Sequence, residues 1–561
     1  MTRSARGGLG LLLVGWLNGC GGGGGGTHVT PTTCNTAGGQ NVTLAVSGYQ
    51  AIPPVANVGC LLFPGNASTV DSALYLLVPQ LATDSQGATA AFLLQGDTLH
   101  PALSAALMAQ RPATASDLGM RFHDFLRSEE RTQWGAIGGP RLGAARPAVV
   151  RGPPDTLGNV RQFSVCGDLN CSTFPKVTAT ARSVSGHLAI YVDNAAPAGG
   201  LTQTDLDSLA SLFNARLYAI DTTAFGRESD IDANGAVIVL MTNVVNKLVT
   251  KTQCKQSGFI AGFFFGADID PLFSGDPRVN HGEVFYSMVA DPDSTLSCVH
   301  SVTQLRNVVP VTFIHEFQHM ISYNQHVLVT GGTQQVTWLD EGMSHFAEEL
   351  GGRSFLPADQ ASFSNFVIGD LFDAYSYLDS SSFHFLAFSS GIGSLAERGA
   401  AWLFVRYFAD QFAADTSFAS VAALTRGLEQ SGLHGAAAIT AAAGTPYTTI
   451  VGRWVLANYV SDYPGLSPPP ELRYTSWRFR TTYADLNGQR PDFFPKPFPL
   501  TPPVEAGKSI AQSGTLHAGS GNYLIAAQSP SAPGYALLFS GPGGAALPAI
   551  LNPRLNVVRL R

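Results

Sequence analysis

Charged residues are scarce in this chain. Asp, Glu, Lys and Arg together make up 13% of its 561 residues, and the acidic residues (40) outnumber Lys and Arg (33). A nucleic-acid-binding protein needs a basic patch or stripe, which the sequence does not show. Beyond the N-terminal segment, no uninterrupted apolar run reaches the roughly 20 residues of a transmembrane helix. These absences predict no nucleic-acid partner and no membrane-spanning helix.

Residues 1–19 have the pattern of a secretory signal. Two arginines precede a short apolar run, and small residues and Cys20 follow it. The sequence Leu-Asn-Gly-Cys at 17–20 resembles a bacterial lipoprotein box, which implies that Cys20 becomes the acylated first residue. Residues 20–40, which start with this Cys and six glycines, are predicted to form a flexible tether. We expect an exported lipoprotein held by its lipid at a bacterial membrane, on the outer-membrane, periplasmic or surface side, with plain secretion as the alternative.

The chain has only seven cysteines, and lipidation of Cys20 leaves six. An even number in an oxidising compartment predicts disulfide bonds, whereas free thiols are typical of the cytosol. Pairing nearest neighbours keeps each bond within one stretch of the chain. The pairs predicted in this way are Cys34–Cys60, Cys166–Cys171 and Cys254–Cys298.

The sequence His-Glu-Phe-Gln-His at 315–319 is the most informative motif of the chain. The apolar residues around it predict a mostly buried helix, with Pro310 in its first turn. On a helix, His315 and His319 lie one turn apart on the same face, so both imidazoles can bind one Zn²⁺. Glu316 lies beside them and is placed to take a proton from a water that the metal activates. The competing interpretation is a buried helix whose histidines are satisfied by hydrogen bonds.

Glutamate is also scarce, with 12 residues in the chain, so a chance occurrence of this motif is rare. Four of the 12 lie between 316 and 349, beside the motif. A catalytic zinc site needs a third, distant protein ligand and keeps one position open for water. In metzincins the motif continues to a further His at a fixed spacing. Here Gln325 occupies that position and His326 is one residue out of register, which excludes that class.

The sequence Trp-Leu-Asp-Glu-Gly at 338–342 resembles the Trp-Leu-Asn-Glu-Gly of the gluzincins, the thermolysin and zinc-aminopeptidase group. This resemblance implies that Glu341, on a second helix, is the third zinc ligand. Within that group, residues 313–349 resemble the hyicolysin-like bacterial metallopeptidases. The resemblance also implies a zincin-like catalytic domain, in which a mixed sheet half and a helical half enclose the site.

Several roles near the motif stay open. Glu348 lies on the same helix face as Glu341 and is the rival third ligand. His345, one turn beyond Glu341, either orients a zinc ligand or packs on the underside of the helix. Asp340 either caps the helix or orients a ligand.

The group that stabilises the tetrahedral intermediate is not assigned. Zinc aminopeptidases use a Tyr shortly before Lys-Gly for this role. The most similar sequence in this chain is Ala-Glu-Arg-Gly at 396–399, which has Ala in place of that Tyr. The candidates from neighbouring segments are Tyr375, Tyr377 and His384.

The chain is too long for one core, and its pattern predicts several domains. Short β-type runs in residues 41–103 predict a small β-sandwich, and residues 104–160 are a linker or a cleaved propeptide. Residues 161–465 form the predicted metallopeptidase domain, with an edge strand for the substrate at 283–289. Residues 471–561 are expected to form a second β-domain. The predicted helices after the motif cover 394–412, 417–429 and 445–460. The predicted fold class is multidomain α+β, with the zincin-like domain flanked by small β-sandwich domains.

A calcium-loop pattern starts at Asp230. Asp230, Asp232 and Asn234 place oxygen donors at alternate positions, and Gly235 supplies the turn. Met241 occupies the position of the closing bidentate Glu, so a structural turn is preferred over a Ca²⁺ site.

These observations predict a zinc-dependent endopeptidase that acts on polypeptides with one catalytic Zn²⁺. An aminopeptidase of the same class is one alternative, but the sequence lacks the Gly-x-Met-Glu-Asn element that anchors a substrate's amino terminus. A non-enzymatic surface lipoprotein with a protease-like scaffold is the other. The intact Glu316 argues against a scaffold, which does not need a base between two ligands.

Overall fold

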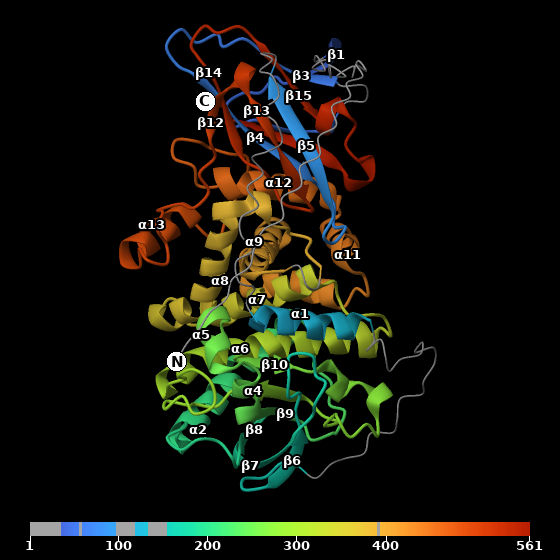
Figure 1. Ribbon diagram of the computed structural model, residues 1–561, viewed down its shortest axis with the longest axis vertical. Helices are drawn as coiled ribbons and strands as arrows, with labels where there is room; N and C mark the ends of the chain where they lie inside the picture. Colours follow the sequence, from blue (N-terminus) through green and yellow to red (C-terminus); the bar gives the residue numbers. More distant parts are fainter. Residues whose placement is uncertain (1–34, 55–58, 97–117, 133–153, 390–392) are drawn as a thin grey trace, which may run out of the picture.

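Three parts follow one another along the long axis of the molecule. Figure 1 shows a sheet with its helices at one end, a layer of helices in the middle and a β-sandwich at the other end. The predicted signal segment and Cys20 lie outside the part of the chain that the computed structural model describes. The described residues are 35–54, 59–96, 118–132, 154–389 and 393–561.

Both ends of the described chain contribute strands to one β-sandwich. Its two sheets have the orders β1-β3-β15-β5-β13 and β12-β14-β4-β16-β2. The strands are β1 (Asn35–Asn41), β2 (Tyr49–Ile52), β3 (Gly59–Phe63), β4 (Ala73–Leu81), β5 (Thr89–Gly96), β12 (Val504–Ala506), β13 (Ala511–His517), β14 (Leu524–Gln528), β15 (Tyr535–Ser540) and β16 (Pro553–Arg559). The prediction of two separate β-domains is therefore wrong, because residues 41–103 and 471–561 supply strands to the same two sheets.

The burial of the strands explains why the two segments combine. β5 alternates along its length, with Ala90, Phe92 and Leu94 buried in the core of the sandwich. β4 is almost entirely buried, because it lies between β14 and β16 and also contacts α12 (Tyr447–Val460). Strands from the other end of the chain complete both sheets, because β5 pairs with β13 and β15 and β4 pairs with β14 and β16.

A six-stranded mixed sheet forms the other end of the molecule, in the order β10-β11-β9-β8-β7-β6. Its strands are β6 (Val160–Ser164), β7 (Lys176–Ser185), β8 (Leu188–Asp193), β9 (Val237–Met241), β10 (Gly262–Phe264) and β11 (Val284–Ser287). The helices of this half are α2 (Gln203–Leu212), α3 (Tyr218–Ala224), α4 (Asn243–Lys247) and α5 (Lys251–Ser257). β9 is buried throughout and pairs in parallel with β8 and β11. The edge strand is β10 and not the predicted segment 283–289, because β10 pairs with the outer side of β11.

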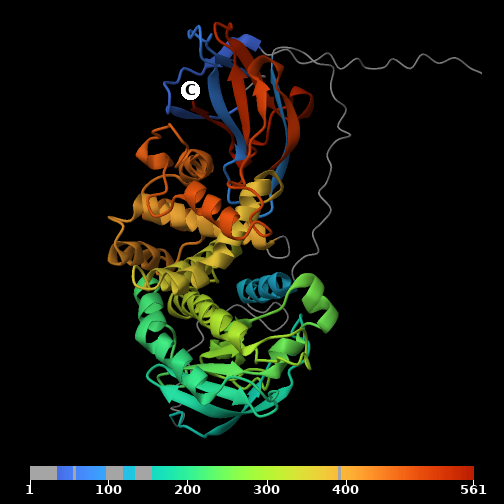
Figure 2. The same ribbon diagram turned by 90° about the vertical axis from the view of Figure 1, so that its left-hand side faces the viewer.

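α6 (Val302–Tyr323) leads from the sheet into the helical half. Ser301 caps it by accepting a hydrogen bond from Gln304 N, so the helix starts earlier than predicted and Pro310 lies inside it. The helices that follow are α7 (Thr337–Arg353), α8 (Gln360–Ser380), α9 (Leu395–Phe412), α10 (Phe418–Glu429), α11 (Gly435–Ala443), α12 and α13 (Phe479–Gln489). α7 packs against α6, α8 and α9, and Figure 2 shows these helices between the sheet and the sandwich. The structure is thus multidomain with mixed sheets and helices, and the zincin-like assignment stays a prediction.

Two of the three predicted disulfides are present. Cys166 pairs with Cys171 in the loop between β6 and β7, and Cys254 of α5 pairs with Cys298. Cys34 lies outside the described residues, so its pairing with Cys60 stays a prediction.

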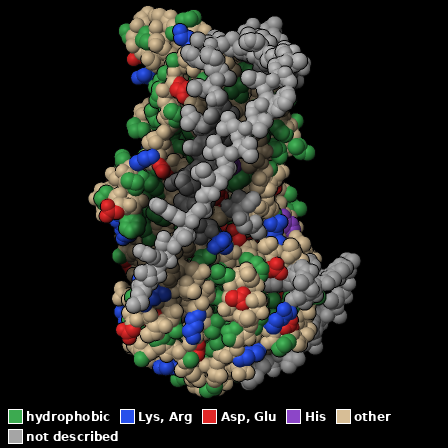
Figure 3. All heavy atoms as spheres, in the orientation of Figure 1, with side chains coloured by type: hydrophobic (Ala, Val, Ile, Leu, Met, Phe, Trp, Pro, Cys, Tyr) green, Lys and Arg blue, Asp and Glu red, His purple; other side chains and the backbone are tan. Residues whose placement is uncertain are grey.

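The charged side chains on one face of the molecule are dispersed. On the face drawn in Figure 3, Lys and Arg of the described residues are scattered among uncharged groups. Among the described helices, none is long and apolar enough to cross a membrane. The lipid anchor and the absence of a nucleic-acid partner stay predictions from the sequence.

Candidate metal centre and active site

α6 and α7 bring the three predicted metal ligands together. His315 and His319 lie one turn apart on α6, and Glu341 lies near the start of α7. Glu341 Oε2 is 3.7 Å from His315 Nε2 and 3.8 Å from His319 Nε2. All three side chains are buried. The two helices therefore direct two imidazole nitrogens and one carboxylate oxygen toward a common point.

The arrangement of these atoms fits one zinc ion. One ligand atom from each side chain lies within 4.8 Å of the other two. A tetrahedral zinc ion about 2.0–2.1 Å from its ligands separates them by roughly 3.4 Å, close to the observed spacing. Burial lowers the pKa of His319 to about 4 and that of His315 well below its usual value. Both rings are therefore neutral, which is the form that binds metal.

Carboxylates hold the opposite nitrogen of each imidazole. Glu348 Oε1 lies 2.7 Å from His315 Nδ1, and Asp340 Oδ2 lies 3.2 Å from His319 Nδ1. Such contacts fix the orientation of a ring and leave its Nε2 for the metal. Asp340 thus has the position of an orienting group, and Glu348 contacts the other side of His315 from Glu341.

In the described structure, His345 forms no hydrogen bond with the Nε2 atom of His315 or His319, the two nitrogens that face the candidate metal position. Its Nδ1 lies 2.9 Å from Asp370 Oδ1 and 3.1 Å from Glu348 Oε1, and its ring centroid is 4.8 Å from that of His315. Burial opposes the charged ring, but the Glu348 and Asp370 carboxylates raise the pKa of His345 well above its usual value. His345 therefore holds Glu348, which in turn holds His315, and the His345 ring also packs edge-on against the ring of His315.

Glu316 lies between the candidate ligands and the edge strand. Its Oε2 accepts a hydrogen bond of 2.9 Å from Phe264 N of β10, and its Oε1 lies 3.5 Å from His123 Nδ1. Burial raises the pKa of Glu316 to about 7. A carboxyl group with such a pKa can take and return a proton near neutral pH.

Sequence reasoning missed two basic residues at this site. The Arg398 guanidinium, on α9, donates to Glu341 Oε2 and lies 3.4 Å from Asp124. Arg398 and His123 both line a cavity of about 390 Å³ that also contains His315 and Glu316. The only signal for Arg398 is its place in the Ala-Glu-Arg-Gly sequence, where the aminopeptidases have a Lys. His123 belongs to a segment that was expected to be a linker or a propeptide. No motif in that segment indicates a residue of the active site.

The three candidates for stabilising the tetrahedral intermediate lie elsewhere. The polar atoms of Tyr375, Tyr377 and His384 contact those of Lys496, Ser520 and Glu397, respectively. None of the three lines the cavity that contains Glu316. Among the described residues that line this cavity, Arg398 is the group that carries a permanent positive charge.

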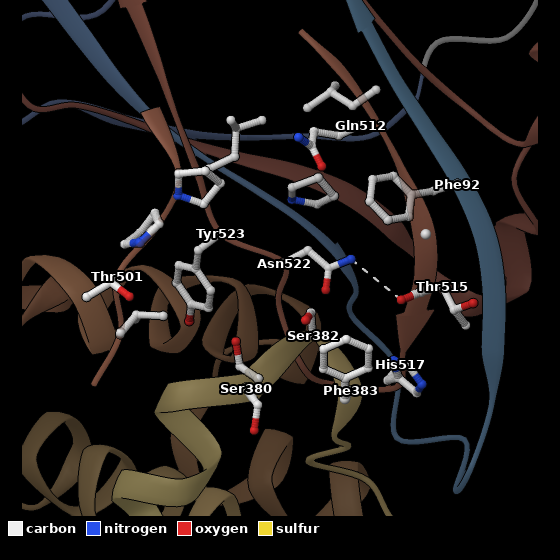
Figure 4. Close-up of a pocket in the computed structure, with 18 of the residues that line it drawn as sticks. Phe92, Ser380, Ser382, Phe383, Thr501, Gln512, Thr515, His517, Asn522 and Tyr523 are labelled. Carbon is white, nitrogen blue, oxygen red and sulfur yellow. Dashed lines mark hydrogen bonds between the residues drawn. The ribbon is translucent and has the colours of Figure 1, made fainter. Parts of the chain in front are cut away.

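A larger cavity, of about 720 Å³, lies between the helical half and the sandwich. Figure 4 shows that its wall carries hydroxyl, amide and ring groups from Ser380, Gln512, Thr515, His517 and Tyr523. Within the described part of the chain, none of its lining residues belongs to a group with metal-binding spacing. The candidate chemistry therefore belongs to the smaller cavity beside α6.

Comparisons with known proteins found a distant similarity to one metalloprotease. No family model matches the chain. The chain is 24% identical over 151 residues to the neutral metalloprotease ShpI of Staphylococcus hyicus. The match covers 27% of this chain and 32% of that protein. The match spans less than a third of either protein, so it supports a distant relationship to a metalloprotease at most.

Proposed function

We propose that this chain is an exported zinc-dependent endopeptidase of the gluzincin type. The observation that carries the proposal is the meeting of His315, His319 and Glu341 around one point, with Glu316 beside them at the edge strand. The similarity to a neutral metalloprotease supports the same chemistry. A bound Zn²⁺ supplies a Lewis acid for the scissile carbonyl and lowers the pKa of water.

Glu316 is the proposed general base. Its carboxylate takes a proton from the attacking water and later gives it to the leaving amine. The hydrogen bond from Phe264 N holds Oε2, which leaves Oε1 to exchange the proton. Arg398 supplies positive charge at the cavity wall and is the proposed partner of the negative charge that develops on the carbonyl oxygen.

The edge strand favours an endopeptidase over an aminopeptidase. The free edge of a sheet can pair with an extended polypeptide through main-chain hydrogen bonds, which needs no free terminus. The acidic residues among those that line the cavity are Glu316 and Glu348, and each already contacts a His. Cleavage of amino-acid anilides without cleavage of blocked internal peptides would instead indicate an aminopeptidase.

The first test measures metal and activity together. The purified mature chain is expected to contain one zinc per molecule by mass spectrometry and to cleave casein. A zinc chelator should remove both properties, and added zinc should restore them. A folded protein without metal or peptidase activity would contradict the proposal and favour a non-enzymatic surface protein.

We also propose that residues 104–160 are an inhibitory propeptide, because α1 (Leu118–Arg131) covers the edge strand. The Phe122 ring lies 5.0 Å from the ring of Phe263. Arg127 Nη2 donates to Phe264 O (3.0 Å), and Glu130 Oε1 accepts from Gly266 N (3.1 Å). An extended substrate paired along β10 would need the Phe264 carbonyl, and Gly266 lies just after this strand.

Arg127→Ala is expected to raise casein cleavage by about tenfold or more, because a loosened α1 leaves more molecules with an open edge strand. The Arg127 guanidinium forms a buried ion pair with Glu130 (3.2 Å). Loss of one partner of such a pair costs about 3–5 kcal/mol, which weakens the docking of the helix.

Arg121→Ala is the matched control, because Arg121 is an exposed residue of the same helix. It should leave cleavage unchanged. Lower activity of Arg127→Ala with an unchanged circular dichroism spectrum would show instead that α1 is a structural part of the enzyme.

A further inference from the structure

A cluster of three acidic residues lies outside the cavity described above. It joins the loop between α3 and β9 to the start of β11. One carboxylate oxygen each from Asp230, Asp232 and Glu283 lies within 4.8 Å of the others. Asp230 and Asp232 belong to the loop whose sequence has the first half of a calcium-binding pattern, with Met241 in place of the closing Glu. Glu283 comes from a different part of the chain and adds the carboxylate that the local sequence lacks.

The pairing of two strands brings Glu283 to the loop. β9 and β11 are parallel neighbours, with Val284 opposite Ile238. Glu283 directly precedes β11, and its carbonyl accepts a hydrogen bond from Ile238 N (2.7 Å). The side chain of Glu283 therefore enters the sheet beside the end of the 230–235 loop.

The Glu283 carboxylate is buried, and only one of its two oxygens accepts hydrogen bonds in the described structure. The residue is 1% exposed, and its Oε1 accepts hydrogen bonds from Ser229 Oγ (2.5 Å) and Ile231 N (3.0 Å). Its Oε2 is buried without a hydrogen-bond partner in the described structure. A buried carboxylate oxygen without a partner is costly, and Asp232 next to it adds repulsion between like charges. The cluster thus has an oxygen that a cation would satisfy.

The nearby polar groups compensate the negative charge of the cluster only in part: Gly235 N donates to Asp230, and Asn234 N donates to Asp232. The Arg161 guanidinium, which acts electrostatically on Asp232, donates to Asn280 O (3.0 Å). The Asn234 amide donates its Nδ2 hydrogens to Asp232 and Asp155, so Asn234 presents no oxygen to the cluster in this arrangement. Asp155 instead adds a further carboxylate beside the loop.

We propose that Asp230, Asp232 and Glu283 bind a Ca²⁺ ion. The donors are all carboxylate oxygens, which hard cations prefer, and the absence of His and Cys from the group disfavours zinc. Calcium accepts several ligands from the protein in irregular geometry, whereas magnesium keeps most of its water. The ion connects the 230–235 loop to the start of β11, and β11 pairs with the edge strand β10.

Calcium binding is tested on the whole mature chain, stripped of metals and reloaded with zinc. Isothermal titration calorimetry with CaCl₂ should show one Ca²⁺ per chain, and Tm should rise with calcium because the ion binds the folded state. Glu283→Gln, which keeps the shape and removes the charge, should bind calcium at least about tenfold more weakly and lose most of the rise in Tm.

Two further variants separate binding from folding effects. Asp230→Asn changes an exposed residue of the cluster and should weaken calcium binding in the same way. Asp293→Asn removes the same charge from an exposed loop and should bind calcium like the unmodified chain. Absence of a calcium-dependent heat and Tm rise in the unmodified chain would overturn the proposal. Unchanged binding in both Glu283→Gln and Asp230→Asn, or an equal effect of Mg²⁺, would overturn it as well.

Discussion

Glu316→Gln should reduce casein cleavage by about 100- to 10,000-fold, the usual contribution of a general base, while zinc stays bound. Gln has nearly the same shape, and its carbonyl oxygen can accept the hydrogen bond that Phe264 N donates to Glu316. It cannot take a proton at neutral pH. His315, His319 and Glu341 are unchanged, so metal analysis should still find one zinc per chain.

The control for this experiment is Glu505→Gln, the same change in β12 of the sandwich. It should keep both zinc and activity, because Glu505 lies in another domain and contacts Gln512. Full activity of Glu316→Gln would exclude Glu316 as the base. Loss of zinc in that variant would mean that Glu316 binds or positions the metal.

Glu341→Ala should remove most of the zinc, because it deletes one of three ligand atoms at the proposed centre. Glu348→Ala should weaken zinc binding by only about 10–100-fold, since Glu348 contacts His315 Nδ1 and orients the ring. The comparison is informative because His315, His345 and Glu348 also form a group with metal-binding spacing. Zinc content at a fixed concentration of a competing chelator measures the difference.

Glu341→Gln extends this test without opening a cavity. In Glu341→Ala the buried Arg398 loses one of its carboxylate partners, so the variant is also expected to be less stable. Thermal unfolding therefore accompanies each zinc measurement. All variants must be folded for this comparison. A larger zinc loss in Glu348→Ala than in Glu341→Ala or Glu341→Gln would then indicate that His315, His345 and Glu348 bind the zinc instead.

The local sequence predicted the helices that carry the candidate site. The predicted helix at 394–412 corresponds to α9, which Ser394 and Glu397 start with a capping box, and the predicted helix at 417–429 corresponds to α10. The meeting of Glu341 with the two histidines follows from the packing of α7 on α6, as the resemblance to the gluzincins implied. Caps and helical spacing act over three or four residues, which is why they can be read from the sequence.

Contacts between distant segments were decided by the tertiary structure alone. The sequence did not show that Arg398 reaches Glu341, that His123 lies at Glu316, or that the two ends of the chain share one sandwich.

The sequence by itself determined the candidate metal-binding motif of this protein, because the two histidines and the proposed base Glu316 lie within about one helical turn, whose spacing is fixed. The tertiary structure decided which carboxylates orient the histidines and that the Arg398 side chain contacts Glu341. It also decided that Glu283 lies beside the acidic residues of the loop at Asp230. Such partners are separated by tens to hundreds of residues, and only the packing of buried helices and the register of paired strands brings them together.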